Sequence, residues 1–222
     1  MTKPYKFDPH THTSETSRCS RITAAQLVKG YHAVGFGGIA ITDHLNKWYT
    51  SSFDDWDTYL DYFLRGYKAA KAHGDKIGLD VILGAEARFD SVNGEFLLYG
   101  LDEDFLRRNP NFHMLNLQKF YSRYGGEILI IQAHPYRGED KPCMGCIHGA
   151  EAYNGNPRHM SHNKKARKLC AKHPELYPTS ASDTHELGDI GAGWMEFDQP
   201  VADSRRFREL VMRREYVLER RG

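Results

Sequence analysis

The sequence lacks the features that define several protein classes. No stretch reaches about 18 consecutive apolar residues, so we expect no membrane-spanning helix and no membrane partner. Four cysteines in 222 residues are too few for a disulfide framework. Residues 1–12 contain no apolar segment of signal-peptide length. We therefore expect a cytoplasmic protein.

The sequence also lacks an excess of charge of either sign. Lys and Arg number 30 and Asp and Glu number 29, which gives a net charge of +1. This balance disfavours long nucleic acid as a partner, because such binding depends on a positive field. Hydrophobic residues make up 40% and charged residues 27%, a globular composition. With no linker or repeat visible, residues 1–222 are expected to form one domain.

Short apolar runs alternate with longer amphipathic stretches. The expected strands are 5–8, 38–42, 80–85, 95–99, 127–132, 148–153, 177–181 and 215–218. The expected helices are 23–34, 54–73, 102–107, 111–123, 161–172 and 201–213. This alternation predicts an α/β fold with a parallel sheet, either a small or distorted (β/α) barrel or an open doubly wound sheet.

Histidine is abundant, with 12 residues, and its positions are informative. Imidazole and carboxylate side chains follow the C-terminal ends of five expected strands, at the edge where α/β folds form their sites. Nitrogen and oxygen donors of this kind suit Zn²⁺, Mn²⁺ or Fe²⁺. The five clusters contain Asp8, His10 and His12; Asp43 and His44; Glu86; His134; and Asp183 and His185.

Two of these clusters have a spacing suited to chelation. Residues i and i+2 of an extended strand point to the same side, so His10 and His12 can hold one ion, as can Asp183 and His185. Five clusters together predict a multinuclear metal centre, at which carboxylates bridge ions that clamp a displacement at phosphorus. Asp43 and Asp8 lie beside the ligands, where a carboxylate supports a metal-bound imidazole or the catalysis, although plain structural polarity is the alternative.

The order of these motifs resembles a known family. The matching stretches, which span Asp8 to His185, are HTHTSETS, GAEARF, FLLYGLDEDFL, QAHPYR, EAYNGNPRH and SASDTH. The chain resembles the PHP (polymerase and histidinol phosphatase) superfamily, and more narrowly its short bacterial stand-alone members. The resemblance implies a distorted (β/α)7 barrel, with two to three divalent ions (Zn, Mn or Fe) in a cleft at the C-terminal ends of the strands.

The resemblance also implies a ligand set. Glu86 would bridge the first ion to a second, which His134 also binds, and His44 and His185 would hold a third. The ligands of the first ion would be His10, His12, Glu86 and Asp183.

The sequence departs from the family pattern at two of these ions. Many members have a His for the second ion just after the strand that here ends near Gly100, and Asp102 is the candidate replacement, ahead of His113. For the third ion, many members have Asp or His five or six residues after HxH. Ser17 and Arg18 stand there in this chain, and the nearest candidate ligand is Glu15.

Two arginines are candidates for binding an anion near these metals. Arg137 follows His134 by three residues, and Arg158 follows another strand end. The planar guanidinium binds two phosphate oxygens at once, although a solvated surface role is the alternative for such residues. Cys143 and Cys146 form a CxxC, which alone predicts ordinary loop thiols more strongly than a zinc or redox site.

These features predict metal-dependent hydrolysis of a small phosphorylated substrate by a metal-activated water. Arg137 and Arg158 would bind the phosphate, and Asp43, Asp183 or a His would move the proton. The alternatives are hydrolysis of an amide or other acyl bond, of the amidohydrolase type, and a non-catalytic metal-binding accessory module.

Overall fold

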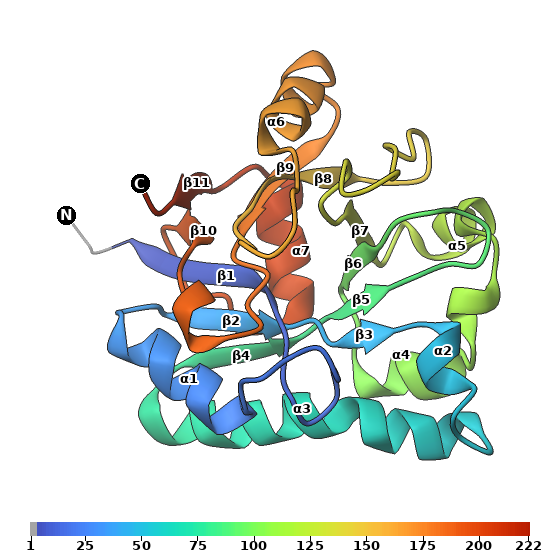
Figure 1. Cartoon of the computed structure of the whole chain (residues 1–222), viewed down its shortest axis with the longest axis horizontal. Coiled ribbons are helices and arrows are strands. Elements are labelled where there is room, and N and C mark those ends of the chain that lie inside the picture. Colours follow the sequence, from blue (N-terminus) through green and yellow to red (C-terminus); the bar gives the residue numbers. More distant parts are fainter. Residues whose placement is uncertain (1–3) are drawn as a thin grey trace.

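The computed structural model describes residues 4–222, in which the strands pair into two sheets (Figure 1). The first sheet has the strand order β11-β10-β1-β2-β4. Within it, β1, β2 and β4 are parallel, whereas β10 runs antiparallel to β1 and to β11. Its strands are β1 (Tyr5–Thr11), β2 (Gly38–Ile41), β4 (Asp80–Leu83), β10 (Gly193–Phe197) and β11 (Val217–Arg220).

The second sheet continues the first. Its order is β3-β5-β6-β7-β8-β9, and β3 and β5 follow β2 and β4 along the chain after the short breaks at 42–43 and at Gly84. An isolated bridge between Thr11 and Thr184 brings the end of β1 beside the segment that follows β9. The strands are β3 (His44–Leu45), β5 (Ala85–Ala87), β6 (Phe96–Tyr99), β7 (Leu129–Gln132), β8 (Gly149–Asn154) and β9 (Tyr177–Ala181).

The expected α/β class is confirmed, but the expectation of a wholly parallel sheet is wrong. Strand β6 runs antiparallel to both β5 and β7. The short loop 88–95 from β5 reverses the chain direction, whereas the longer connection 100–128 to β7 contains helical segments. Strand β10 was not expected at all, although its residues alternate between buried and half-buried positions. Closure into a seven-stranded barrel stays a prediction.

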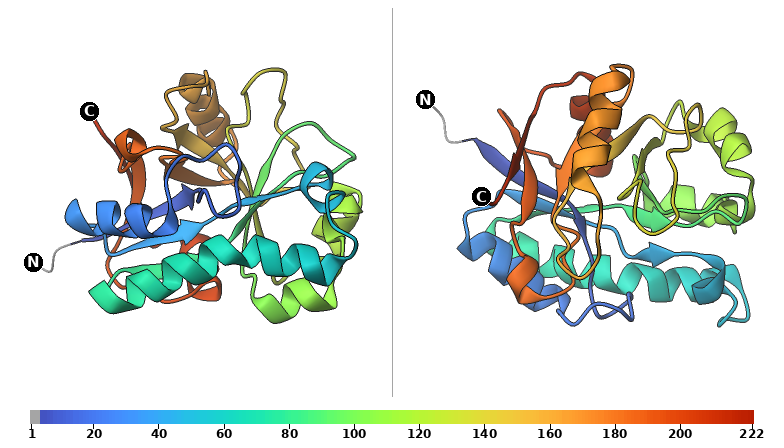
Figure 2. Two further views of the ribbon diagram at one scale, coloured as in Figure 1. Left: turned by 60° about the horizontal axis from the view of Figure 1, so that its bottom comes forward. Right: turned by 45° about the horizontal axis from the view of Figure 1, so that its top comes forward.

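Helices cover the outer faces of these sheets. Figures 1 and 2 show α3 as a long helix beneath both sheets with α1 beside it. Among residues 4–222, no helix has the length and apolar character needed to cross a membrane. The helices are α1 (Ala24–Ala33), α2 (Lys47–Thr50), α3 (Trp56–Ile77), α4 (Glu103–Arg108), α5 (Leu117–Tyr124), α6 (Asn163–Lys172) and α7 (Ser204–Met212), with 3₁₀ turns η1 (Phe112–Met114) and η2 (Leu187–Asp189).

Helix α1 shows how packing positions the site. Thr23 caps it and forms a capping box with Gln26. Leu27 and Tyr31 are fully buried on one face, in the same core cluster as Ile39 of β2. This packing fixes β2, whose C-terminal end leads directly into the polar segment 42–44.

Helix α3 is longer than expected. We expected it to stop at Gly74, but it continues to Ile77 and ends at Gly78, whose φ of +77° is the left-handed conformation of a helix C-cap. Gly74 instead permits a close approach, since a Cβ there would lie 2.5 Å from the carbonyl oxygen of Leu79. The glycine marks tight packing inside the helix and not its end.

The expected helix 111–123 is interrupted. Asn111 takes a left-handed φ of +53° before η1, and Leu115 is extended. Asn116 then caps α5 by accepting a hydrogen bond from Gln118 N. The two asparagines divide the segment into a 3₁₀ turn and a short α-helix.

Candidate metal centre

The two histidines of the HxH motif point to the same side of β1, as expected. Their Nε2 atoms lie 3.0 Å apart, and both side chains are fully buried. The pairing of β1 with β2 shifts register between Asp8 and Thr11, next to these histidines. The strand thus places two imidazoles side by side near its C-terminal end.

Glu86 in β5 lies between two pairs of imidazoles. Its Oε1 is 3.3 Å from His10 Nε2 and 3.1 Å from His134 Nε2. Its Oε2 is 3.4 Å from His12 Nε2 and 2.9 Å from His44 Nδ1. One ligand atom from each of His10, His12 and Glu86 lies within 4.8 Å of the others, a spacing that fits a metal ion. Each oxygen of Glu86 therefore faces a different pair of nitrogen donors.

Asp183 completes this buried group from the segment after β9. Its Oδ1 lies 3.5 Å from the Nε2 atoms of both His10 and His12. Asp183 and His134 have φ values of +54° and +28°, an unfavourable backbone for these residues that often marks a functional position. We call the following residues, each 0–2% exposed, the inner donors: His10, His12, Glu86, His134 and Asp183.

The charges of the inner donors depend on one another. Burial raises the pKa of Glu86, but the imidazoles of His10 and His44 outweigh it and hold this pKa well below its usual range. Burial likewise opposes ionisation of Asp183, and His10, with other neighbouring groups, overrides it and lowers the pKa of Asp183. Both carboxylates are thus charged, as metal ligands must be.

The Nδ1 atoms of His10 and His12, which point away from the other donors, have polar partners of the kind that fits a divalent metal at Nε2. His10 Nδ1 lies 2.8 Å from Oε1 of Glu151, and His12 Nδ1 lies 3.3 Å from Ser17 Oγ. Such contacts hold Nδ1 as the protonated atom and leave Nε2 free to bind a metal. Glu151 also accepts a hydrogen bond from His134 N at 2.8 Å.

Glu151 was missed by the sequence analysis. It lies within β8, in the quoted stretch EAYNGNPRH, and is only 1% exposed. A carboxylate between two alanines of an expected strand was the available signal, because a buried carboxylate requires partners.

Asp43 and Asp8 support the motif from outside the metal cleft. Asp43 accepts hydrogen bonds from Thr13 N, Thr13 Oγ1 and Ser17 Oγ at 2.6–2.8 Å. Asp8 accepts one from the Tyr31 hydroxyl at 2.6 Å. Burial raises the pKa of each carboxyl to about 6, although these hydrogen bonds oppose the shift. Both oxygens of Asp43 are thus committed to the loop that follows HxH.

A second group of donors lies nearer the surface. One ring nitrogen from each of His12, His44 and His185 lies within 4.8 Å of the other two, and His44, Glu86 and Glu95 form a similar group. The side chains of His44, His185 and Glu95 are 12–16% exposed. We call these three residues the outer donors.

Glu95 takes the position that we expected for Asp102. Because β6 is antiparallel to β5, the start of β6 lies at the metal edge and its end points away. Glu95, just before β6, lies 3.6 Å from His134 Nε2. Asp102 caps α4 by accepting from Phe105 N and pairs with Arg205, so the structure does not place it with the donors.

Two other candidate ligands also lie apart from the donors. The carboxylate of Glu15 accepts from Ala24 N at 3.0 Å and so serves the first turn of α1. His113 is buried against Trp56, with ring centroids 6.0 Å apart, and burial lowers its pKa to about 4. Both residues have structural roles in this fold.

Comparison with known families agrees with this arrangement. The family model described as the PHP domain matches residues 8–192. The chain belongs to the PHP-domain family. No curated protein sequence matches closely enough to count as a relative. Membership accounts for the order of the histidine and carboxylate motifs along the chain.

Solved structures share the fold at low sequence identity. A two-domain protein from Bacteroides vulgatus, described as containing a predicted PHP-like metal-dependent phosphoesterase, is 16% identical with a TM-score of 0.68. The match covers 98% of this PHP domain but only 65% of that chain. A putative metal-dependent phosphoesterase from Bifidobacterium adolescentis is 17% identical (TM-score 0.56, covering 95% and 98%). An amidohydrolase from Chromobacterium violaceum, described with bound SO4 and no metal, is 16% identical (TM-score 0.57, covering 96% and 97%).

A cavity of about 380 Å³ opens onto the donors of this PHP domain. Asp183, His185, His44 and Glu95 line it, together with Arg137 and other cationic residues. Nη2 of Arg137 donates to Asp183 Oδ2 at 2.8 Å, as well as to an Asn and a Ser. Its Nε is buried and has no hydrogen-bond partner within residues 4–222. Arg137 thus lines the cavity, and one of its guanidinium nitrogens, Nε, is left without a partner.

Arg158 lines the same cavity, but its guanidinium is engaged. Its two terminal nitrogens donate to the two oxygens of Asp189 at 3.0 and 2.6 Å. Asp189 also accepts from His185 N at 2.9 Å. The contacts of Arg158 therefore brace the backbone at an outer donor, whereas those of Arg137 leave part of its guanidinium free.

Proposed function

We propose that this PHP domain hydrolyses a small phosphoester at a centre of two to three divalent ions, with Zn, Mn and Fe as candidates. The observation that carries the proposal is the cavity in which Arg137, with an unpaired Nε, faces acidic and imidazole donors. An arginine beside such donors suits a substrate that binds metals through one set of oxygens and a guanidinium through another. The four cysteines are free thiols, in keeping with the cytoplasm.

In this proposal the donors and the two arginines have different roles in hydrolysis. Bound divalent ions supply a Lewis acid and a lowered pKa for water. The inner donors would hold those ions, and Glu86 would offer an oxygen to each of two pairs of imidazoles. Arg137 orients the phosphate and offsets charge on its oxygens. Arg158 contributes by bracing His185 through Asp189.

Proton movement falls to Asp183 or a neighbouring imidazole in this proposal. Asp183 lines the cavity, and its Oδ1 lies 3.3 Å from His185 Nδ1. Asp43, our other candidate, uses both oxygens to bind Thr13 and Ser17. We assign Asp43 the role of holding the loop beneath His12.

Amide or acyl hydrolysis at the same metals is the second candidate. It is favoured by the fold shared with a protein described as an amidohydrolase. A neutral amide does not need the guanidinium of Arg137, which is why we prefer the phosphoester. A non-catalytic accessory module is the third reading, and the completeness of the inner donors weighs against it.

A paired screen tests the proposal. The protein is stripped of metal, reloaded separately with Zn²⁺, Mn²⁺ and Fe²⁺, and assayed on a panel of small phosphomonoesters and phosphodiesters and on a matched panel of N-acyl substrates. We expect release of phosphate or alcohol that stops when a chelator is added and returns with metal. Turnover of only the acyl panel would establish the second candidate, and no turnover on either panel with full metal loading would favour the third.

A further inference from the structure

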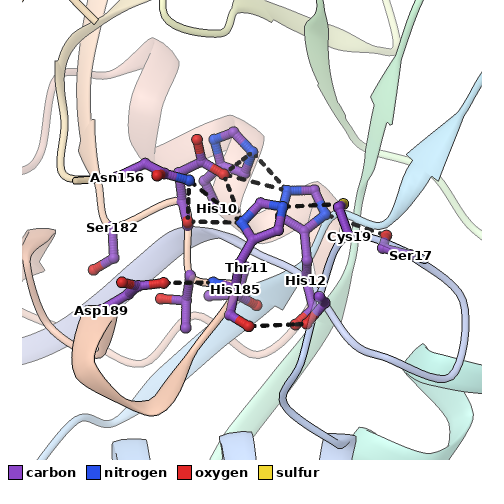
Figure 3. A network of polar contacts seen from close by, with 12 residues as sticks. His10, Thr11, His12, Ser17, Cys19, Asn156, Ser182, His185 and Asp189 are labelled. Atoms are coloured by element: carbon purple, nitrogen blue, oxygen red, sulfur yellow. Dashed lines mark hydrogen bonds and ion pairs between the residues drawn. The ribbon is translucent and has the colours of Figure 1, made fainter. Parts of the chain in front are cut away.

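The thiol of Cys19 lies between two outer donors. Its Sγ is 3.2 Å from His44 Nε2 and 3.2 Å from His185 Nε2. Figure 3 shows Cys19 beside the rings of His12 and His185, with its sulfur turned toward the cluster. Cys19 belongs to none of the five clusters that were expected to bind metal.

The protons of this group do not satisfy all its contacts. His44 Nδ1 lies 2.9 Å from a Glu86 oxygen. His185 Nδ1 lies 3.0 Å from the carbonyl oxygen of Asp183, nearer than the amide of Asn156 at 3.5 Å. The Glu86 contact does not have the geometry of a hydrogen bond, and His44 Nδ1 has no hydrogen-bond partner in the part of the chain that the structure describes. The carbonyl oxygen of Asp183 holds the proton of the His185 ring on Nδ1, which leaves His185 Nε2 as an acceptor that faces the sulfur.

We infer that Cys19 binds the outermost ion as a thiolate, together with Nε2 of His44 and Nε2 of His185. Typical Zn–N and Zn–S bonds in a tetrahedral site separate the nitrogen and sulfur by about 3.5 Å, so each of the two nitrogen–sulfur distances of 3.2 Å needs to lengthen by only a few tenths of an ångström. The thiol proton passes to solvent when the ion binds. The inference rests on the proposed metal centre but not on the proposed reaction.

The loop that carries Cys19 is held in place. Ser17 N donates to Thr13 O, Ser20 N donates to Ser17 O, and Ser20 Oγ donates to His12 O. Cys19 thereby supplies the donor that we had sought in Glu15, whose carboxylate instead faces α1. A sulfur ligand also sets the metal preference of this site, because thiolate favours Zn²⁺ over the harder Mn²⁺ and Mg²⁺.

Cobalt provides a direct probe. Metal-stripped protein is titrated with Co²⁺ without oxygen, and absorbance is followed in the near-ultraviolet, where thiolate-to-cobalt charge transfer appears. We expect a band in the wild type that is lost in Cys19→Ser, with one fewer bound equivalent per chain. Cys19→Asp keeps an anionic donor and should retain more metal than Cys19→Ser while lacking the band.

The CxxC pair provides a matched control. Cys146 Sγ contacts Gln118 and Cys143 N contacts Gln132, both away from the donors, so a Cys143→Ser/Cys146→Ser double variant should keep the band. In a second measurement on wild type, Zn²⁺ should protect Cys19 alone from alkylation, read by mass spectrometry. A band that persists in Cys19→Ser, a cobalt-loaded wild type without a band, or unprotected Cys19 would each overturn the inference. Neither readout uses substrate, so a failure of the proposed hydrolysis would be seen separately.

Discussion

The inner and outer donors differ in how firmly the protein holds them. The inner donors are 0–2% exposed, and the rings of His10 and His12 are held by Glu151 and Ser17, whereas His134 Nδ1 has no hydrogen-bond partner among residues 4–222. The side chains of the outer donors are 12–16% exposed, and they line the cavity that the inner donors Glu86 and Asp183 also reach. Buried, braced ligands keep their geometry at little cost when a metal binds, whereas exposed ones are free to adjust. The comparison therefore predicts a tightly held inner centre and a more exchangeable outer ion beside the substrate.

Removing the charge of Glu86 should have the largest effect, because its two oxygens face four imidazoles of both groups. Glu86→Gln keeps the shape but leaves one oxygen and a neutral side chain. We expect a loss of more than one metal equivalent and a fall in kcat/KM of more than about 100-fold, since even outer contacts of ligands are worth 10–100-fold. Elemental analysis and kinetics on the same samples measure both.

Glu95→Gln is the matched control for Glu86 among the outer donors. It removes the same charge from a side chain that is 16% exposed, and it should retain the inner ions. Equal metal loss in the two variants would break the distinction between inner and outer donors. Unchanged metal and turnover in Glu86→Gln would show that Glu86 is a structural residue.

Arg137 and Arg158 should also differ in how much their removal lowers kcat/KM. Arg137→Ala removes the guanidinium with a free Nε and should lower kcat/KM for a phosphoester by up to about 100-fold, the value of a charge-assisted contact. Arg137→Lys should recover only part of this, because an ammonium cannot bind two oxygens in parallel. Arg158→Ala should cost only several-fold, since Asp189 already occupies its guanidinium. Equal losses would mean that Arg158 leaves Asp189 to bind substrate.

The positions of the candidate donors were predictable where strands run parallel, and this prediction failed at β6. The i, i+2 spacing placed His10 and His12 together, and the family resemblance added Asp183. Asp183 lies beside them although its φ of +54° departs from the extended strand that the spacing argument assumed. Asp102 followed the same rule and was wrongly placed, because β6 is antiparallel and presents Glu95 instead. Strand direction depends on pairing between distant segments, which periodicity does not encode.

Two further misses have local causes. A side chain in the loop before a helix can either cap the helix or face the metal cleft. The carboxylate of Glu15 accepts a hydrogen bond from the first turn of α1, whereas the thiol of Cys19 lies beside His44. Gly74 has the sequence signature of a helix end but serves close packing. The residue type allowed capping or metal binding for Glu15, and a helix end or close packing for Gly74. Only the position in the folded chain distinguished these roles.

Glu151→Gln tests whether bracing makes the inner centre tight. The variant keeps a hydrogen-bond acceptor for His10 but removes the negative charge from a side chain that is 1% exposed. We expect metal affinity to fall about 10–100-fold, as for other carboxylates that orient metal-bound histidines. Competition with a chromophoric chelator measures this affinity. The fully loaded variant should keep much of its activity, and an unchanged affinity would show that burial alone holds the inner donors.

The smallest effect is expected at Trp48, on the outer side of the cleft. Trp48 is 61% exposed and lines a second cavity of about 380 Å³ together with His44 and Arg88. Its indole lies at 4.9 Å from the Tyr49 ring, with Arg18 at 4.7 Å from its centroid. This exposed aromatic wall, next to the outer donors, is suited to an aromatic leaving group.

Trp48→Ala should therefore raise KM several-fold for aryl phosphoesters and leave KM for alkyl phosphoesters unchanged. An aromatic contact is worth about 0.5–1.5 kcal/mol, which sets the size of the effect. Because the contact exists equally in the ground and transition states, kcat should not change. Trp48→Phe, which keeps a ring, is the matched control and should lie near the wild type. An equal rise in KM for both substrate classes would mean that Trp48 shapes the cleft through Tyr49 and does not bind the leaving group.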